Sequence, residues 1–114
     1  MKAISIKQPY TEAIRQGLKL LEIRTWKTDY RGDMLICASA KPDENYDLSG
    51  ENLIFGHALC IVELFDITDF LPEHANAACI NYFPGAFAWH LRNIRKIEPF
   101  PVKGKLGLFE VNFE

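Results

Sequence analysis

Three ionisable side chains lie close together in the segment GLKLLEIRTW near the start of the chain. They are Lys19, Glu22 and Arg24, and Gly17 precedes them. Lysine offers a mobile cation with three donors, glutamate a carboxylate, and arginine a rigid fork suited to phosphate or carboxylate. Gathered in one pocket, these groups predict a nucleotide-binding site, in which Gly17 lets the backbone approach a ligand closely. The alternative is a purely structural ion pair between Glu22 and Arg24.

The elements expected around this segment would bring the side chains together. Apolar residues recur at helical spacing over residues 10–17, which predicts a short amphipathic helix with Gly17 as its left-handed cap. Residues 20–26 are predicted to form a strand, whose alternation puts Glu22, Arg24 and Trp26 on one face. Lys19 lies just before this strand, and its side chain can reach the same pocket opening as Glu22 and Arg24.

Four more residues are candidates for ligand contacts. Gln8 could hydrogen-bond a base edge and Tyr10 could stack on a base, although Tyr10 also fits a core position of the helix. Trp26 shares its predicted face with the charged pair and suits unpaired bases. Lys103, beside Gly104 in a predicted turn, is a candidate phosphate contact.

Charge is segregated along the chain. Residues 1–31 carry a net +4, residues 32–73 carry −8, and residues 92–105 carry +4, although the whole chain carries only −2. If the two basic segments meet in space, they form a positive face that attracts phosphates. A pI of about 5.9 argues against avid non-specific binding to nucleic acid.

The rest of the pattern predicts an α+β, mostly β, fold. Its 114 residues fit one domain, over residues 1–114. We expect a small, mostly antiparallel barrel with short peripheral helices. Residues 41–51 are predicted to be a loop, and residues 71–83 are ambiguous. Besides residues 20–26, the predicted strands cover residues 3–6, 33–39, 56–66, 86–91 and 107–113.

Several classes of protein are excluded by what the sequence lacks. It has no apolar run long enough for a membrane span and no secretory signal, so we expect a cytoplasmic monomer. Cys37, Cys60 and Cys79 are widely spaced and are expected to be reduced thiols. No spacing of cysteines and histidines fits a metal site, and no motif fits a cofactor, so neither is expected.

The G-x-K-x-x-E-x-R pattern of residues 17–24 resembles the signature of the ASCH domain, a relative of the PUA RNA-binding fold. The segments SIKQPY, YRGDMLICAS, GHALCIVEL and FAWHL through PVKGKLGLFEV are also similar to that family. The resemblance covers nearly the whole chain. It implies a PUA-like β-barrel with peripheral helices that binds RNA or a modified nucleoside.

The same resemblance raises the question of catalysis. Some members of the family are amidohydrolases that remove the acetyl group from N4-acetylcytidine, and their catalytic set is a lysine, a threonine and a glutamate. Lys19 matches the lysine, but Glu22 stands at the threonine position, so the expected nucleophile is absent. Lys19 and Glu22 could still activate water as a pair. The spacing does not decide whether Glu63 or Glu73 is the third residue.

Three functions therefore remain open. The favoured one is an RNA- or modified-nucleoside-binding domain whose cleft is lined by Lys19, Glu22 and Arg24. The second is a small amidohydrolase acting on N4-acetylcytidine-type nucleosides. The third is a protein-interaction module on the same fold, in which the acidic loop of residues 43–51 contacts a partner of unknown identity.

Overall fold

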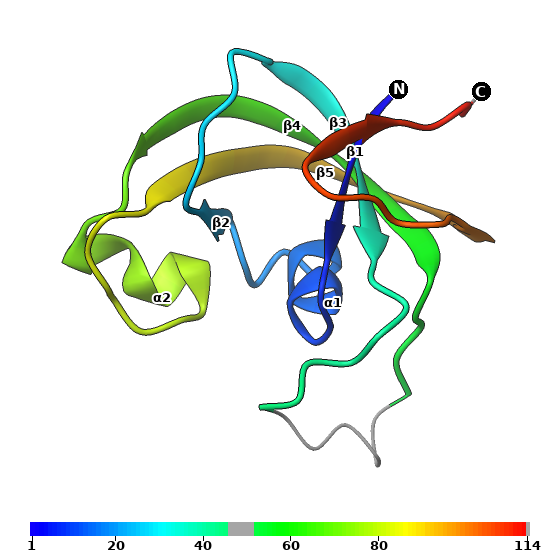
Figure 1. The fold of residues 1–114 in the computed structure, drawn as a ribbon, viewed down its shortest axis with the longest axis horizontal. Helices are drawn as coiled ribbons and strands as arrows, with labels where there is room; N and C mark the ends of the chain where they lie inside the picture. Colours follow the sequence, from blue (N-terminus) through cyan, green and yellow to red (C-terminus); the bar gives the residue numbers. More distant parts are fainter. Residues whose placement is uncertain (46–51, 114) are drawn as a thin grey trace.

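The computed structural model describes residues 1–45 and 52–113 of the chain (Figure 1). That part of the chain is mostly β-sheet with short helices, which confirms the predicted class. In chain order the elements are β1 (Lys2–Ile6), α1 (Tyr10–Arg15), β2 (Leu21–Arg24), β3 (Gly32–Ala38), β4 (His57–Asp69), the 3-10 helix η1 (Pro72–His74), α2 (Ala75–Ala78), β5 (Phe87–Pro101) and β6 (Leu108–Glu110).

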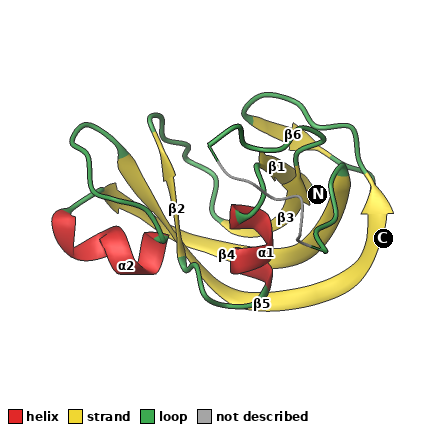
Figure 2. Cartoon of the chain, turned by 90° about the horizontal axis from the view of Figure 1, so that it is seen from below, coloured by secondary structure: helices red, strands yellow, loops and turns green. Residues whose placement is uncertain are grey.

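The strands form a single curled sheet in the order β2-β5-β4-β3-β1-β6. All neighbours are antiparallel except β1 and β3, which run parallel. Figure 2 shows the sheet bending around α1 as a half-barrel. Because β1 pairs with β6, the two ends of the chain lie side by side in Figure 1.

Helix α1 packs into the hollow of this sheet. Its Ile14 is fully buried among apolar side chains from four strands, including Ile4, Met34 and Trp89. The Thr11 hydroxyl donates a 2.6 Å hydrogen bond to the carbonyl of Ile6 at the end of β1. This packing fixes the position of the helix that precedes the charged segment.

The predicted end of one strand was wrong. The sequence predicted that the strand starting near residue 86 ends at Leu91, but β5 continues to Pro101 alongside β4. Its charged residues are accommodated because Arg92 pairs with Glu63 on the adjacent β4 and Arg95 pairs with Asp33 on β3.

The long strands β4 and β5 owe their curvature to irregular pairing. Their register shifts at three places along the ladder. Each such bulge bends a strand and increases its twist.

The short helices lie mainly in the segment that the sequence left ambiguous. Residues 71–83 contain η1 and α2. No helix in the described part of the chain is long and apolar enough to cross a membrane.

Candidate functional site

A pocket of about 980 Å³ opens beside the charged segment predicted to carry the site. Its walls come from β1, α1, the turn that carries Lys19, β2, the segments after β3 and after α2, and residues 102–107. Among the described residues that line it, basic side chains outnumber acidic ones by six to two. The polar and charged lining side chains are Ser5, Lys7, Tyr10, Lys19, Glu22, Arg24, Ser39, Lys41, Asp43, Lys103 and Lys105.

The end of α1 determines where Lys19 lies. Gly17 has φ +78°, and the amides of Gly17 and Leu18 donate to the carbonyls of Ile14 and Ala13. This is the Schellman arrangement, in which a left-handed residue, usually glycine, ends a helix. The prediction that Gly17 caps the helix is confirmed, and the next turn of chain carries Lys19 into the pocket wall.

Lys19 is a buried cation at the base of the pocket. Only 1% of the residue is exposed, and its Nζ donates to the carbonyl of Ala78. The same nitrogen lies 3.5 Å from Oε1 of Glu22 and 5.2 Å from the centre of the Tyr10 ring. Burial lowers the pKa of the Lys19 ammonium, and the carboxylate of Glu22 offsets part of that effect.

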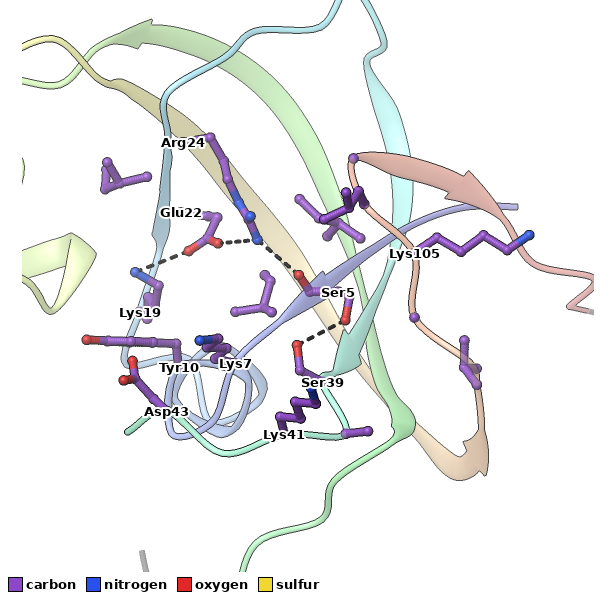
Figure 3. A pocket seen from close by; sticks show the side chains of 18 of the residues that line it. Ser5, Lys7, Tyr10, Lys19, Glu22, Arg24, Ser39, Lys41, Asp43 and Lys105 are labelled. Atoms are coloured by element: carbon purple, nitrogen blue, oxygen red, sulfur yellow. Dashed lines mark hydrogen bonds and ion pairs between the residues drawn. The ribbon is translucent and has the colours of Figure 1, made fainter. Parts of the chain in front are cut away.

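Glu22 is held between two cations (Figure 3). Its Oε2 lies 3.0 Å from Nη2 of Arg24, while its Oε1 faces Lys19. The prediction that strand alternation places Glu22 and Arg24 on one side of the strand is confirmed, as is the expectation that Lys19 reaches the same group. Glu22 is 7% exposed. A carboxylate so placed can accept hydrogen bonds from a ligand only at the pocket side.

Arg24 connects this ion network to β1. Its Nη2 also donates to the Ser5 carbonyl at 3.1 Å, and the Ser5 hydroxyl lies 3.1 Å from the hydroxyl of Ser39. The buried Nε of Arg24 has no hydrogen-bond partner among the residues that the structure describes. An arginine with an unsatisfied donor is a candidate for rearrangement when an anionic group binds.

Three predicted ligand contacts lie outside the pocket and have structural roles. Gly17 forms the helix cap. Gln8 is fully buried, where its side-chain amide donates to the Ile54 carbonyl and its Oε1 accepts from the Glu12 amide, both at 2.9 Å. Trp26 packs edge-on against Trp89, with ring centres 4.8 Å apart. The strand alternation that was expected to aim Trp26 at the site ends with β2 at Arg24.

Tyr10 and Lys103, the other two predicted ligand contacts of this set, line the pocket. Sequence reasoning did not select Ser5 on β1, Lys7 just after it, or Ser39 and Lys41 after β3. The signal for Ser5 was absent because local periodicity does not reveal the parallel pairing of β1 with β3. That pairing brings the ends of both strands to the same wall.

The two basic segments of the chain meet in part at this pocket. Lys7, Lys19 and Arg24 from the first segment share it with Lys103 and Lys105 from the last. In Figure 3 the Lys105 side chain extends away from the ion network. Arg92 and Arg95 instead bind Glu63 and Asp33, at 2.9 and 2.6 Å, on the sheet outside the pocket.

The remaining candidate groups lie elsewhere. Neither Glu63 nor Glu73 lines the pocket. Cys37 and Cys60 are buried free thiols, whereas Cys79 is exposed. Within residues 1–45 and 52–113, no cluster of three or more histidine, cysteine or carboxylate side chains could hold a metal ion. In the acidic loop proposed as a docking surface, residues 46–51 lie outside the described residues.

Comparison with known proteins agrees with this fold. The family model of the ASCH domain matches residues 4–101. The crystal structure of ASCH from Zymomonas mobilis is 17% identical, with a TM-score of 0.72 over 97% of this chain and 87% of that one. Two variants of that protein, a tyrosine-to-phenylalanine and a serine-to-alanine mutant, are each 15% identical with TM-scores of 0.66, over 97% of this chain and 89% and 87% of theirs. No curated protein gave a significant match.

Proposed function

The chain belongs to the ASCH domain family, and on that premise we propose that it binds RNA, or a modified nucleoside, in the pocket around Lys19, Glu22 and Arg24. The family is PUA-like and generally RNA-binding. The observation that carries the proposal is the buried carboxylate of Glu22. It forms ion pairs with Lys19 and Arg24 in a pocket that is also lined by several other lysines.

The chemistry of a nucleotide supports this choice. A fixed carboxylate can accept hydrogen bonds from an exocyclic amino group of a base, as acidic side chains do with cytosine. Tyr10, beside Lys19, offers an aromatic surface in the same pocket. Lysines at the mouth would meet the phosphates, and a volume of about 980 Å³ is ample for one nucleotide unit.

The test is a titration of the purified protein with bulk transfer RNA at two salt concentrations. We expect affinity that falls steeply with salt, because bound lysines displace counterions from the RNA. Lys103→Ala should weaken binding and reduce the salt dependence by about one displaced ion. Arg24→Ala should weaken binding while circular dichroism still reports a folded protein.

Lys96→Ala is the matched control for Lys103→Ala. Lys96 is an exposed lysine on β5 and does not line the pocket. Equal losses in the two variants would contradict the pocket as the binding site. Indifference to RNA at every salt concentration would rule out polymer binding and favour a free nucleoside or a protein partner.

One observation keeps hydrolysis as a second candidate. Lys19 is a buried amine with a lowered pKa, and a carboxylate lies 3.5 Å from its Nζ. Such a pair can activate water for attack on an amide, releasing acetate and cytidine from N4-acetylcytidine. The assay is release of acetate from N4-acetylcytidine by the wild-type protein and by Lys19→Met. Absence of turnover by the wild type removes this candidate.

A further inference from the structure

A second polar group lines the same pocket, on the side away from Lys19 (Figure 3). The hydroxyls of Ser5 and Ser39 lie 3.1 Å apart, at the ends of two parallel strands, with Lys41 close by. The turn that carries Lys103 and Gly104 lines the pocket at this position too. None of these side chains takes part in the ion network of Glu22.

Gly104 presses directly against the serine pair. A Cβ atom at this position would lie 2.7 Å from Oγ of Ser5 and 3.2 Å from its Cβ, so only a glycine lets the turn approach so closely. The start of the turn is anchored by a 3.0 Å hydrogen bond from the Val102 amide to the Gly56 carbonyl. The turn therefore holds Gly104 against Ser5, and Lys103, the residue before it, also lines the pocket.

Among the described residues, the donors at this place keep capacity for a ligand. Two hydroxyls that share one hydrogen bond leave one hydroxyl hydrogen for another acceptor. Lys41 and Lys103 form no ion pair within the described residues, whereas Glu22 is already neutralised by Lys19 and Arg24. Asp43 is the other acidic residue described in the pocket lining. An anion is the ligand that such a set of free donors and cations fits.

We propose that Ser5, Ser39, Lys41 and Lys103 form a phosphate subsite. It would hold the phosphate of a nucleotide unit whose base lies near Glu22, and in this respect it rests on the proposed function. The ligand class is then a phosphorylated nucleotide, either a mononucleotide or one unit of an RNA strand. A free nucleoside would leave the subsite empty.

The subsite is tested first without any base, by titrating ¹⁵N-labelled protein with inorganic phosphate and following its amide resonances. We expect saturable shifts at Ser39 and Gly104. Losing one hydrogen bond to a charged group is worth a factor of about ten, so Lys103→Ala should weaken phosphate binding by about tenfold. Lys96→Ala should leave it unchanged. Shifts that do not saturate, or equal effects in the two variants, would overturn the subsite.

A second arm separates this inference from the proposed function. Cytidine, cytidine 5′-monophosphate and a short single-stranded RNA are titrated into the wild type and Ser39→Ala. The subsite predicts that the phosphorylated ligands bind about tenfold more tightly than cytidine, and that Ser39→Ala reduces this preference. The mononucleotide and the RNA distinguish the two sources of phosphate.

These titrations distinguish a failure of the proposed function from a failure of the phosphate subsite. If inorganic phosphate produces saturable shifts at Ser39 and Gly104 but cytidine, the mononucleotide and the RNA all fail to bind, the proposed function fails and only an anion site stands. If RNA binds while phosphate produces no saturable shift at Ser39 and Gly104, the subsite is wrong and the proposed function stands.

Discussion

At the scale of single residues, Glu22 is the centre of the site. One carboxylate oxygen faces Lys19 and the other faces Arg24, so the carboxylate balances two cations. Lys19 depends on this arrangement more than Arg24 does, because it is fully buried while the Arg24 side chain is 26% exposed. A buried charge that loses its partner is strongly destabilised.

Glu22→Gln should therefore lower the free energy of unfolding by about 2–4 kcal/mol near neutral pH, since it leaves the Lys19 ammonium buried without a counter-ion. It should also lower the pKa of Lys19 further. Urea unfolding followed by circular dichroism measures the first effect.

The matched control is Glu63→Gln, which makes the same change in a pair with Arg92 on the outside of the sheet. Exposed pairs contribute little, so its effect should be clearly smaller. Equal losses of stability in the two variants would show that the Glu22 network contributes no more than a surface ion pair.

At the scale of elements, the short segment between α1 and β2 places Lys19 through backbone bonds on both sides. The Lys19 amide donates to the Ala13 carbonyl of α1, and the Leu20 amide donates to the Ala77 carbonyl of α2. Two helices therefore hold the chain where the lysine enters the pocket wall. This explains how so long a side chain can be buried with a fixed partner.

The adjoining strands β3 and β4 bury two thiols whose ionisation links stability to pH. Burial raises the pKa of Cys37 and of Cys60 to about 12. Below the ordinary cysteine value both folded and unfolded states keep the proton. Above it the unfolded chain loses the proton and the folded one retains it, so stability falls as pH rises toward 12.

As the pH rises from 8 to 10, each buried thiol should therefore lower the free energy of unfolding by about 1–2 kcal/mol. Lys19, whose pKa is lowered, acts in the opposite direction as pH rises toward the ordinary lysine value. The pH dependence of urea unfolding is therefore compared between the wild type and the Cys37→Ala, Cys60→Ala double variant. An identical slope in both proteins would contradict the linkage.

At the scale of the whole molecule, the pocket exists because distant segments converge on one end of the half-barrel. The parallel pairing of β1 with β3 brings Ser5 and Ser39 together, and the turn after β5 packs Gly104 onto Ser5. The first and last basic segments therefore share one wall, while the charges of β5 are neutralised on the sheet. A chain of low net charge thus acquires a locally positive pocket.

The sequence by itself determined the local features. Helical spacing and a terminal glycine predicted α1 and its cap, alternation predicted most strands, and alternation in β2 predicted that Glu22 and Arg24 share a side. These follow from short-range geometry, which a pattern of side chains records directly. The pattern of residues 17–24, together with similar segments along nearly the whole chain, also identified the family.

Only the tertiary structure decided which residues share the pocket. The sequence suggested Gln8 and Trp26 as ligand contacts. In the folded chain the Gln8 side chain donates a hydrogen bond to the Ile54 carbonyl, and the Trp26 ring packs against Trp89. Ser5 joins the pocket through a parallel pairing of strands far apart in the chain. The extension of β5 likewise depends on ion pairs that its arginines form with acidic residues on β3 and β4. Such contacts depend on strand order, which local periodicity does not encode.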